Sequence, residues 1–267
     1  LSGSTASGKT STSIELAKYI INIHKKKCEI INFDSLLFYK ELNIGTAKPT
    51  KEEQKGINHH LIDISSIKCP INASTFVEIA TKTFEDLNSR DIVPIFVGGS
   101  AFYIRALLKG MIHSTEQDLP PISNINQSII NELKEDPSKI NEYLKINDPE
   151  IFNFFHPNDI YRLTRAAEYY CLNKKKYSIE IIKSNKNKPY DFSINNQLKG
   201  EMLHIYLEVE KQNHLLIMHD RAKEMIHSGL IEEVQDILEK GFNRSLKPLS
   251  SIGYKETIQY LNAPSLQ

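Results

Sequence analysis

The strongest constraint on the fold is a short pattern at the beginning of the chain. It reads Gly3, Ser4, Thr5, Ala6, Ser7, Gly8, Lys9 and Thr10 and matches G-x-x-x-x-G-K-S/T in full. In such a loop the backbone N–H groups point at phosphate oxygens, the lysine reaches the terminal phosphates, and the threonine hydroxyl can hold Mg²⁺. We therefore predict a phosphate-binding loop with Thr10 as the metal ligand. The strand that normally precedes such a loop is expected upstream of Leu1.

The remaining chain alternates between strand and helix patterns. The predicted strands are residues 28–33, 92–97 and 202–209, and the predicted helices are residues 9–21, 74–87, 101–109 and a long helix that ends near Gly229. Ser74 is the predicted cap of the second helix. Because strands that alternate with helices form parallel sheets, we predict an α/β fold, a P-loop core with a three-layer parallel sheet.

The composition changes in the middle of the chain. Residues 115–199 are rich in Asn, Lys, Ser and Ile, with helical patterns and few strand signals. We interpret this part as a helical insertion domain. The predicted domains are residues 1–114 (first part of the core), 115–200 (insertion) and 201–267 (second part of the core, which we expect to continue past Gln267).

Charge and cysteine content exclude several classes of protein. The 33 Lys and Arg residues balance the 33 Asp and Glu residues, so an RNA site would have to be a local patch. No apolar run approaches the roughly 18 residues of a membrane span. Cys28, Cys69 and Cys171 lie far apart and are predicted to be reduced, buried and inert, as in a cytoplasmic protein.

Two polar residues follow predicted strands directly. Asp34 and Ser100 should therefore lie at the carboxyl edge of the sheet, where ligands bind. Asp34 could act as a general base, or it could cap a turn or help to position Mg²⁺. The strand at 92–97 ends in Gly98 and Gly99 rather than in the Asp that a nucleotide-hydrolysing enzyme uses, which weakens an ATPase interpretation.

Two arginines lie one turn apart on a predicted helix. Arg162 and Arg165 follow a helix entry at residues 156–159 and share one helix face. They could bind phosphates of a substrate or of RNA. The alternative is that they pair with Asp159 and Glu168 on the surface.

Eight segments match motifs of one known family, in order along the chain. The segments are residues 3–10, 34–39, 43–49, 59–63, 97–103, 156–166, 221–230 and 252–256. They resemble that family's G-P-T-A-S-G-K-T, D-S-x-x-x-Y, D-I-G-T-A-K-P, H-x-L-x-D, V-G-G-T-x-x-Y, H-P-N-D-x-x-R-x-x-R-A, R-x-x-x-M-x-x-x-G-L and I-G-Y-K-E. The chain thus resembles the tRNA dimethylallyltransferases, also called tRNA isopentenyltransferases, over nearly its whole length.

The resemblance implies Mg²⁺-dependent transfer of a dimethylallyl group from its diphosphate to the N6 amine of the adenosine just 3′ of the tRNA anticodon. We expect the protein to be a monomer. Asp34 would accept the amine proton, and Ser100 would stand where the family usually has Thr, next to the diphosphate. Arg165 and Arg221 would bind the diphosphate together with the loop 3–10. The residues implied to contact tRNA are Asp34, Ser35, Leu36, Leu37, Lys48, Tyr161, Arg162, Leu163, Thr164 and Arg165.

The chain also departs from the family pattern. Ile217 stands where the family has the first Arg of R-x-x-x-R, and no basic residue occurs in 120–127. Three other interpretations stay open at this point. They are a prenyltransferase acting on free adenine nucleotides, a P-loop nucleotide kinase or ATPase, and a binding module without catalysis.

Overall fold

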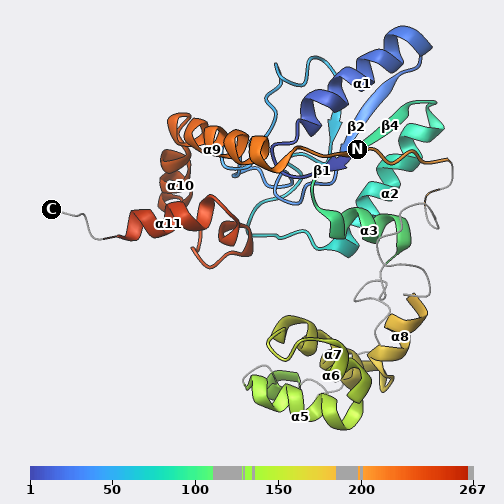
Figure 1. The fold of residues 1–267 in the computed structure, drawn as a ribbon, viewed down its shortest axis with the longest axis vertical. Helices are drawn as coiled ribbons and strands as arrows, with labels where there is room; N and C mark the ends of the chain where they lie inside the picture. Colours follow the sequence, from blue (N-terminus) through green and yellow to red (C-terminus); the bar gives the residue numbers. More distant parts are fainter. Residues whose placement is uncertain (111–127, 129, 134–135, 185–197, 199–200, 264–267) are drawn as a thin grey trace. The chain divides into compact units, whose positions relative to one another are not determined.

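The computed structural model describes residues 1–110, 128, 130–133, 136–184, 198 and 201–263. The chain forms two compact units: unit 1 is Leu1–Lys109 with Phe192–Gln267, and unit 2 is Gly110–Asp191 (Figure 1). Each unit is described by itself. The predicted domain boundaries at residues 115 and 200 lie outside the described residues.

A parallel sheet lies at the centre of unit 1. Strand β2 (Cys28–Asn32) pairs in parallel with β3 (His59–His60) on one side and with β4 (Val93–Val97) on the other. Pro94 is tolerated in β4 because the N–H groups of a strand alternate in direction: Val93 N donates to the Lys27 carbonyl oxygen (2.9 Å), so the nitrogen of Pro94 faces away from β2 and interrupts no bond of the β2–β4 ladder. Every strand pairing within the described residues is parallel, which confirms the predicted α/β class.

A second, very short pair of strands adjoins this sheet. Strand β1 (Ser2–Gly3) pairs in parallel with β5 (Tyr206–Leu207), and Ser2 also forms a parallel bridge with Gly98. The predicted strand at 202–209 is confirmed at Tyr206–Leu207, the residues that pair with β1.

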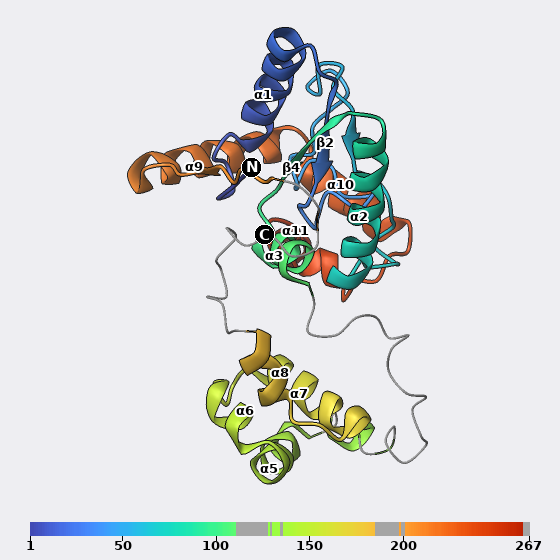
Figure 2. The ribbon, with the colours of Figure 1, turned by 90° about the vertical axis from the view of Figure 1, so that its right-hand side faces the viewer.

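Helices cover both faces of the sheet. The helices of these layers are α1 (Lys9–His24), α2 (Ala73–Ser89) and α3 (Ala101–Lys109). Side chains of a strand alternate between its faces. Cys28 and Ile30 of β2 pack in one core cluster with α1, whereas Ile31 and the following Phe33 pack in another with α2 and α3. Figure 2 shows α1 and α2 on opposite sides of β2.

The start of α2 differs from the prediction. The helix begins at Ala73, and the Asn72 side chain accepts a hydrogen bond from the Thr75 N–H (2.9 Å). The prediction of Ser74 as the cap is wrong, because Asn72 already supplies the oxygen that the first turn requires.

The C-terminal part of unit 1 is helical. Its elements are α9 (Lys211–His227), α10 (Leu230–Glu239), the 3₁₀ helix η2 (Lys247–Ser250) and α11 (Tyr254–Asn262). Gly229, with φ of 99°, separates α9 from α10 in a backbone conformation that favours glycine. Tyr254 and Val234 are fully buried in a cluster that also contains Tyr39 and Leu42. This cluster fixes the loop after β2 against the C-terminal helices.

Unit 2 is helical within its described residues. Its described elements are α5 (Pro137–Asn147), α6 (Pro149–Phe154), α7 (Ile160–Asn173) and α8 (Tyr177–Ser184). Asp148 is fully buried, and its carboxylate accepts hydrogen bonds from the Ser178 N–H (2.9 Å) and hydroxyl (2.6 Å). Asp159 caps α7 by accepting from the Arg162 N–H (3.2 Å). The predicted helix entry at 156–159 is thereby confirmed.

The three cysteines are free, and they differ in exposure. Cys28 and Cys171 are buried as predicted, whereas Cys69 is exposed, so the prediction of burial is wrong for Cys69. Burial raises the pKa of the Cys28 thiol to about 11, and the thiolate is the reactive form. No described helix is long and apolar enough to cross a membrane.

This difference predicts the outcome of thiol titration. A disulfide exchange reagent at neutral pH should modify one thiol of the native protein rapidly, and Cys69→Ser should abolish that rapid phase. Cys28 should react only as the pH approaches 11 or after unfolding. Rapid modification of the Cys69→Ser variant would contradict the buried positions of the other two.

Candidate active site

The loop 3–10 joins β1 to the N-terminus of α1, where the first N–H groups have no partner within the helix itself. Ala6 and Gly8 have left-handed φ angles of 61° and 82°, which turn the backbone sharply before the helix. No side chain of the described residues caps α1, so the N–H groups of its first turn remain available to an anion. A Cβ on Gly3 would lie 2.6 Å from the Leu207 carbonyl oxygen and 2.7 Å from Ser7 Oγ, so this position requires glycine.

Lys9 keeps its ammonium group at this loop. Its Nζ donates to the carbonyl oxygens of Gly3 (3.0 Å) and Ser4 (2.5 Å). Burial lowers the pKa of Lys9 from its usual value, and the nearby Asp34 carboxylate opposes that effect. The cation is therefore held beside the loop and within electrostatic reach of Asp34.

Asp34 lies just past the carboxyl end of β2. Its Oδ1 accepts from the Leu36 N–H (3.2 Å). Its Oδ2 lies 3.5 Å from the point that a Cβ on Gly99 would occupy, and Lys9 Nζ lies 3.8 Å from the same point. The lack of a side chain at Gly99 therefore leaves space between the carboxylate and the ammonium group.

Ser100 adjoins the turn that begins at Asp34. Its hydroxyl oxygen accepts from the Ser35 N–H (3.1 Å), and the hydroxyl donates to Ser35 Oγ (3.3 Å). The close approach depends on Gly98, because a Cβ there would lie 2.6 Å from the Phe33 ring and 2.7 Å from the Asp34 nitrogen. The structure thus brings Asp34 and Ser100 together, on turns after neighbouring strands.

The two glycines have different roles, which substitution should separate. Gly98→Ala should lower the free energy of unfolding by about 1–3 kcal/mol, because its Cβ collides with backbone. Gly99 is exposed, and an added Cβ there makes only ordinary contacts. Gly99→Val should therefore leave the melting temperature nearly unchanged while it fills the space beside Asp34. A large loss of stability in Gly99→Val, measured by thermal unfolding, would contradict this assignment.

A second cation comes from α9. Burial lowers the pKa of Arg221, and Asp34 raises it, so the two groups are electrostatically coupled. Within the described residues, the buried Arg221 Nε has no hydrogen-bond partner. A buried N–H of this kind would gain from an anionic partner. Arg221, Lys9 and Asp34 thus form one charged group beside the loop 3–10.

His214 was not among the residues predicted from the sequence. Its Nε2 lies 2.6 Å from the Thr5 carbonyl oxygen and 3.4 Å from Ser4 Oγ, so α9 is joined directly to the loop. The sequence feature that could have predicted His214 is its spacing, because it precedes Arg221 by seven residues and shares its helix face.

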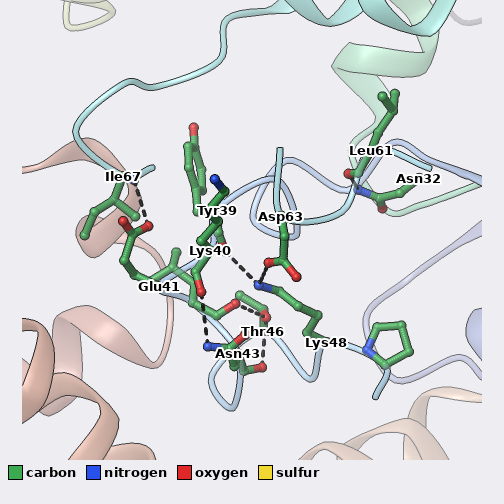
Figure 3. Close-up of polar contacts among 12 residues, drawn as sticks. Asn32, Tyr39, Lys40, Glu41, Asn43, Thr46, Lys48, Leu61, Asp63 and Ile67 are labelled. Atoms are coloured by element: carbon green, nitrogen blue, oxygen red, sulfur yellow. Dashed lines mark hydrogen bonds and ion pairs between the residues drawn. The ribbon is translucent and has the colours of Figure 1, made fainter. Parts of the chain in front are cut away.

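The other predicted contacts in unit 1 lie in the segment after Asp34. Ser35, Leu36 and Leu37 are half-buried in the turn itself. Lys48 lies farther along the chain, and its side chain is only 6% exposed. Its ammonium group is engaged by protein oxygens, as Figure 3 shows.

Five predicted residues belong to α7 of unit 2. Arg162 pairs with Asp159 (3.0 Å) and Arg165 pairs with Glu168 (2.6 Å), as the alternative interpretation expected. Both arginine side chains are more than 60% exposed, so these ion pairs contribute little and could exchange for phosphate. The remaining three differ in exposure: Tyr161 is 70% exposed, Thr164 is half-buried and Leu163 is fully buried in the core of the unit.

The fold and this arrangement define an α/β protein whose charged site lies at the carboxyl ends of parallel strands. The family model described as IPP transferase matches residues 37–266. The chain belongs to this family, as the sequence motifs predicted.

Named relatives and solved structures agree with this assignment. A tRNA dimethylallyltransferase of Sulfurihydrogenibium sp. is 34% identical over 263 residues, which are 98% of this chain and 78% of the relative. One of Staphylococcus aureus is 36% identical over 261 residues, which are 97% and 78% of the two chains. The crystal structure of a tRNA isopentenylpyrophosphate transferase from Staphylococcus epidermidis is similar with a TM-score of 0.60 at 34% identity, over 97% of this chain and 78% of that one. A eukaryotic dimethylallyltransferase acting on tRNA gives a TM-score of 0.81 at 26% identity, over 97% and 62%.

Proposed function

We propose that this chain transfers a dimethylallyl group from dimethylallyl diphosphate to the exocyclic N6 amine of the adenosine 3′-adjacent to the anticodon in tRNA. The main support is the grouping of one carboxylate, Asp34, with two cations, Lys9 and Arg221, beside the loop 3–10. A departing diphosphate requires cations and N–H donors, and an amine that loses a proton requires a base. Lys9, Arg221 and the loop N–H groups supply the cations and donors, and Asp34 supplies the base.

In the proposed reaction the N6 nitrogen forms a bond to the allylic carbon while the bond from that carbon to the diphosphate oxygen breaks. The electron pair of the broken bond leaves with the diphosphate, and the N6 proton moves to Asp34. The N–H groups of the loop, with Lys9 and Arg221, stabilise the charge on the leaving group. Ser100, which contacts the turn after Asp34, would hydrogen-bond the diphosphate end of the donor.

The residues beside the loop fit a magnesium ion. Mg²⁺ is commonly held by one or two protein oxygens together with substrate phosphates, and Thr10 offers an exposed hydroxyl in the first turn of α1. Within the described residues, no three His, Cys, Asp or Glu side chains group as a metal site. Thr10 would thus be the protein's ligand, and the bound ion would neutralise diphosphate charge.

The tRNA contacts are proposed on both units. Ser35, Leu36 and Leu37 adjoin the proposed base, and the exposed Tyr161 and Arg162 are suited to stack on bases and bind phosphate. Thr164 completes that face of α7, Arg165 would contact RNA and the diphosphate, and the buried Leu163 would contribute through its backbone. We also propose that the enzyme acts as a monomer in the cytoplasm.

The proposal is tested by transfer of label from dimethylallyl diphosphate. Protein with Mg²⁺ should label an anticodon stem-loop that carries adenosine at the target position, and a chelator should abolish labelling. A stem-loop with guanosine there should stay unlabelled. Preferential labelling of AMP would favour a prenyltransferase that acts on free adenine nucleotides. Steady ATP hydrolysis without RNA would favour a P-loop ATPase. Either result without stem-loop labelling would refute the proposal.

A further inference from the structure

The ammonium group of Lys48 is enclosed by protein oxygens. Its Nζ donates to the carbonyl oxygen of Tyr39 (2.7 Å) and forms an ion pair with the Asp63 carboxylate (Figure 3). The Lys48 side chain is 6% exposed, whereas that of Asp63 is 48% exposed. A buried ammonium group requires such partners, and a phosphate could reach it only by displacing them.

The two partners of Lys48 lie on segments that run beside each other. Backbone hydrogen bonds join them: Asp63 N donates to the Leu37 oxygen (3.1 Å), and Ser65 N donates to the Phe38 oxygen (2.9 Å). Lys40 N donates to the Ser65 oxygen (3.0 Å). Lys48 therefore joins the two segments at the place where they already pair.

The backbone of this region adopts costly conformations. Ala47, Leu61 and Asp63 have left-handed φ angles of 47°, 61° and 58°. Such conformations in residues other than glycine persist only where surrounding contacts fix them. The ion pair of Lys48 with Asp63 is one such contact. A hydrogen bond from Asn32 Nδ2 to the Leu61 oxygen (2.9 Å) is another.

The side chains of Asn32 and Lys48 also hold the turn 34–39, which carries the proposed base. At its start, the buried Asn32 side chain accepts from the Asp34 N–H (2.9 Å) and donates to the Asp34 oxygen (3.1 Å). At its end, Lys48 holds the Tyr39 carbonyl oxygen. The Asp34 carboxylate bonds to an N–H inside this turn, at Leu36. The direction of the Asp34 carboxylate thus depends on the contacts at both ends of the turn.

We propose that Lys48 is a positioning residue, which holds the turn 34–39 through Asp63 and Tyr39 so that the Asp34 carboxylate is correctly aimed, and that it is not a ligand of RNA phosphate. This inference rests on the proposed role of Asp34 as the base. It assigns to the lysine of the segment 43–49 a function in catalysis rather than in tRNA affinity.

The variants Lys48→Met, Asp63→Asn and their combination test it. Misplacement of a reacting group by about 1 Å can cost about a hundredfold in rate. We expect Lys48→Met to lower the single-turnover rate about ten- to a hundredfold while the Kd for the stem-loop changes less than about threefold. The rate of the double variant should lie within about threefold of the rate of Lys48→Met, because both substitutions remove the same ion pair between Lys48 and Asp63.

Salt dependence separates positioning from phosphate contact. A lysine or arginine that contacts phosphate contributes about one unit to the slope of log Kd against log salt. Lys48→Met should leave that slope unchanged, whereas the control Arg162→Gln should reduce it. A reduced slope with an unchanged transfer rate in Lys48→Met would overturn the inference.

Amide hydrogen exchange provides a readout that does not depend on transfer activity. Exchange in peptides covering residues 37–42 and 61–67 should accelerate at least about fivefold in Asp63→Asn, whose half-exposed side chain tolerates replacement. The exposed Lys51→Met is the matched control and should show no change. Absence of transfer by the wild-type protein would refute the proposed function, whereas unchanged exchange in Asp63→Asn would refute the inference.

Discussion

Asp34→Asn is expected to lower the single-turnover rate of prenyl transfer at least about a hundredfold. Asparagine keeps the size and the hydrogen bond to the Leu36 N–H, but it cannot accept the proton from N6. The Kd for the anticodon stem-loop should change little, because the neutral side chain removes no cation from the RNA site. Rapid-quench measurement of labelled stem-loop, with donor and RNA saturating, would check this result.

Asp91→Asn is a suitable control, since its exposed carboxylate pairs only with Lys26 within the described contacts. It should transfer at the wild-type rate. An Asp34→Asn variant with more than about a tenth of the wild-type rate would show that Asp34 is not the base. The turn at 34–39 would then serve only to place Ser35 and Ser100.

Lys9→Met should raise the KM for dimethylallyl diphosphate about a hundredfold and also lower kcat. The ammonium group is partly buried beside the loop, next to the Asp34 carboxylate, so its removal leaves the diphosphate with one cation fewer. Loss of one preorganised donor to a developing charge typically costs about a hundred- to a thousandfold. Steady-state kinetics against donor concentration would measure both parameters.

Lys18→Met, on the same helix, is the matched control, because Lys18 pairs with Glu15 on the outer surface. It should leave both parameters within about twofold of the wild type. If Lys9→Met raised the KM for the stem-loop rather than for the donor, the loop would bind RNA phosphate and not the donor diphosphate.

The general plan of the core could be predicted because it depends on local patterns. The loop 3–10 is a contiguous string, and the strands at Cys28–Asn32 and Val93–Val97 are short apolar runs bounded by turns. Their common parallel direction places Asp34 and Ser100 at one edge of the sheet. Proximity of these two residues follows from that topology without any knowledge of side-chain contacts.

The details that sequence patterns missed depend on contacts between distant residues. Lys48 is charged and stands in a polar segment, so its burial becomes visible only when Asp63 and Tyr39 are brought beside it. His214 reaches the loop 3–10 across more than 200 residues of sequence. The cap of α2 was misplaced by two residues because Asn72 and Ser74 are both good caps, and only the helix geometry selects between them.

The most direct test of the central claim is a crystal structure of the enzyme with a stem-loop and a non-reactive thiodiphosphate analogue of the donor. The account predicts diphosphate oxygens on the N–H groups of the loop 3–10, near Lys9 and Arg221, and an Asp34 oxygen about 2.6–3.2 Å from N6 of the target adenosine. A diphosphate bound away from that loop, or an Asp34 side chain turned away from N6, would contradict it.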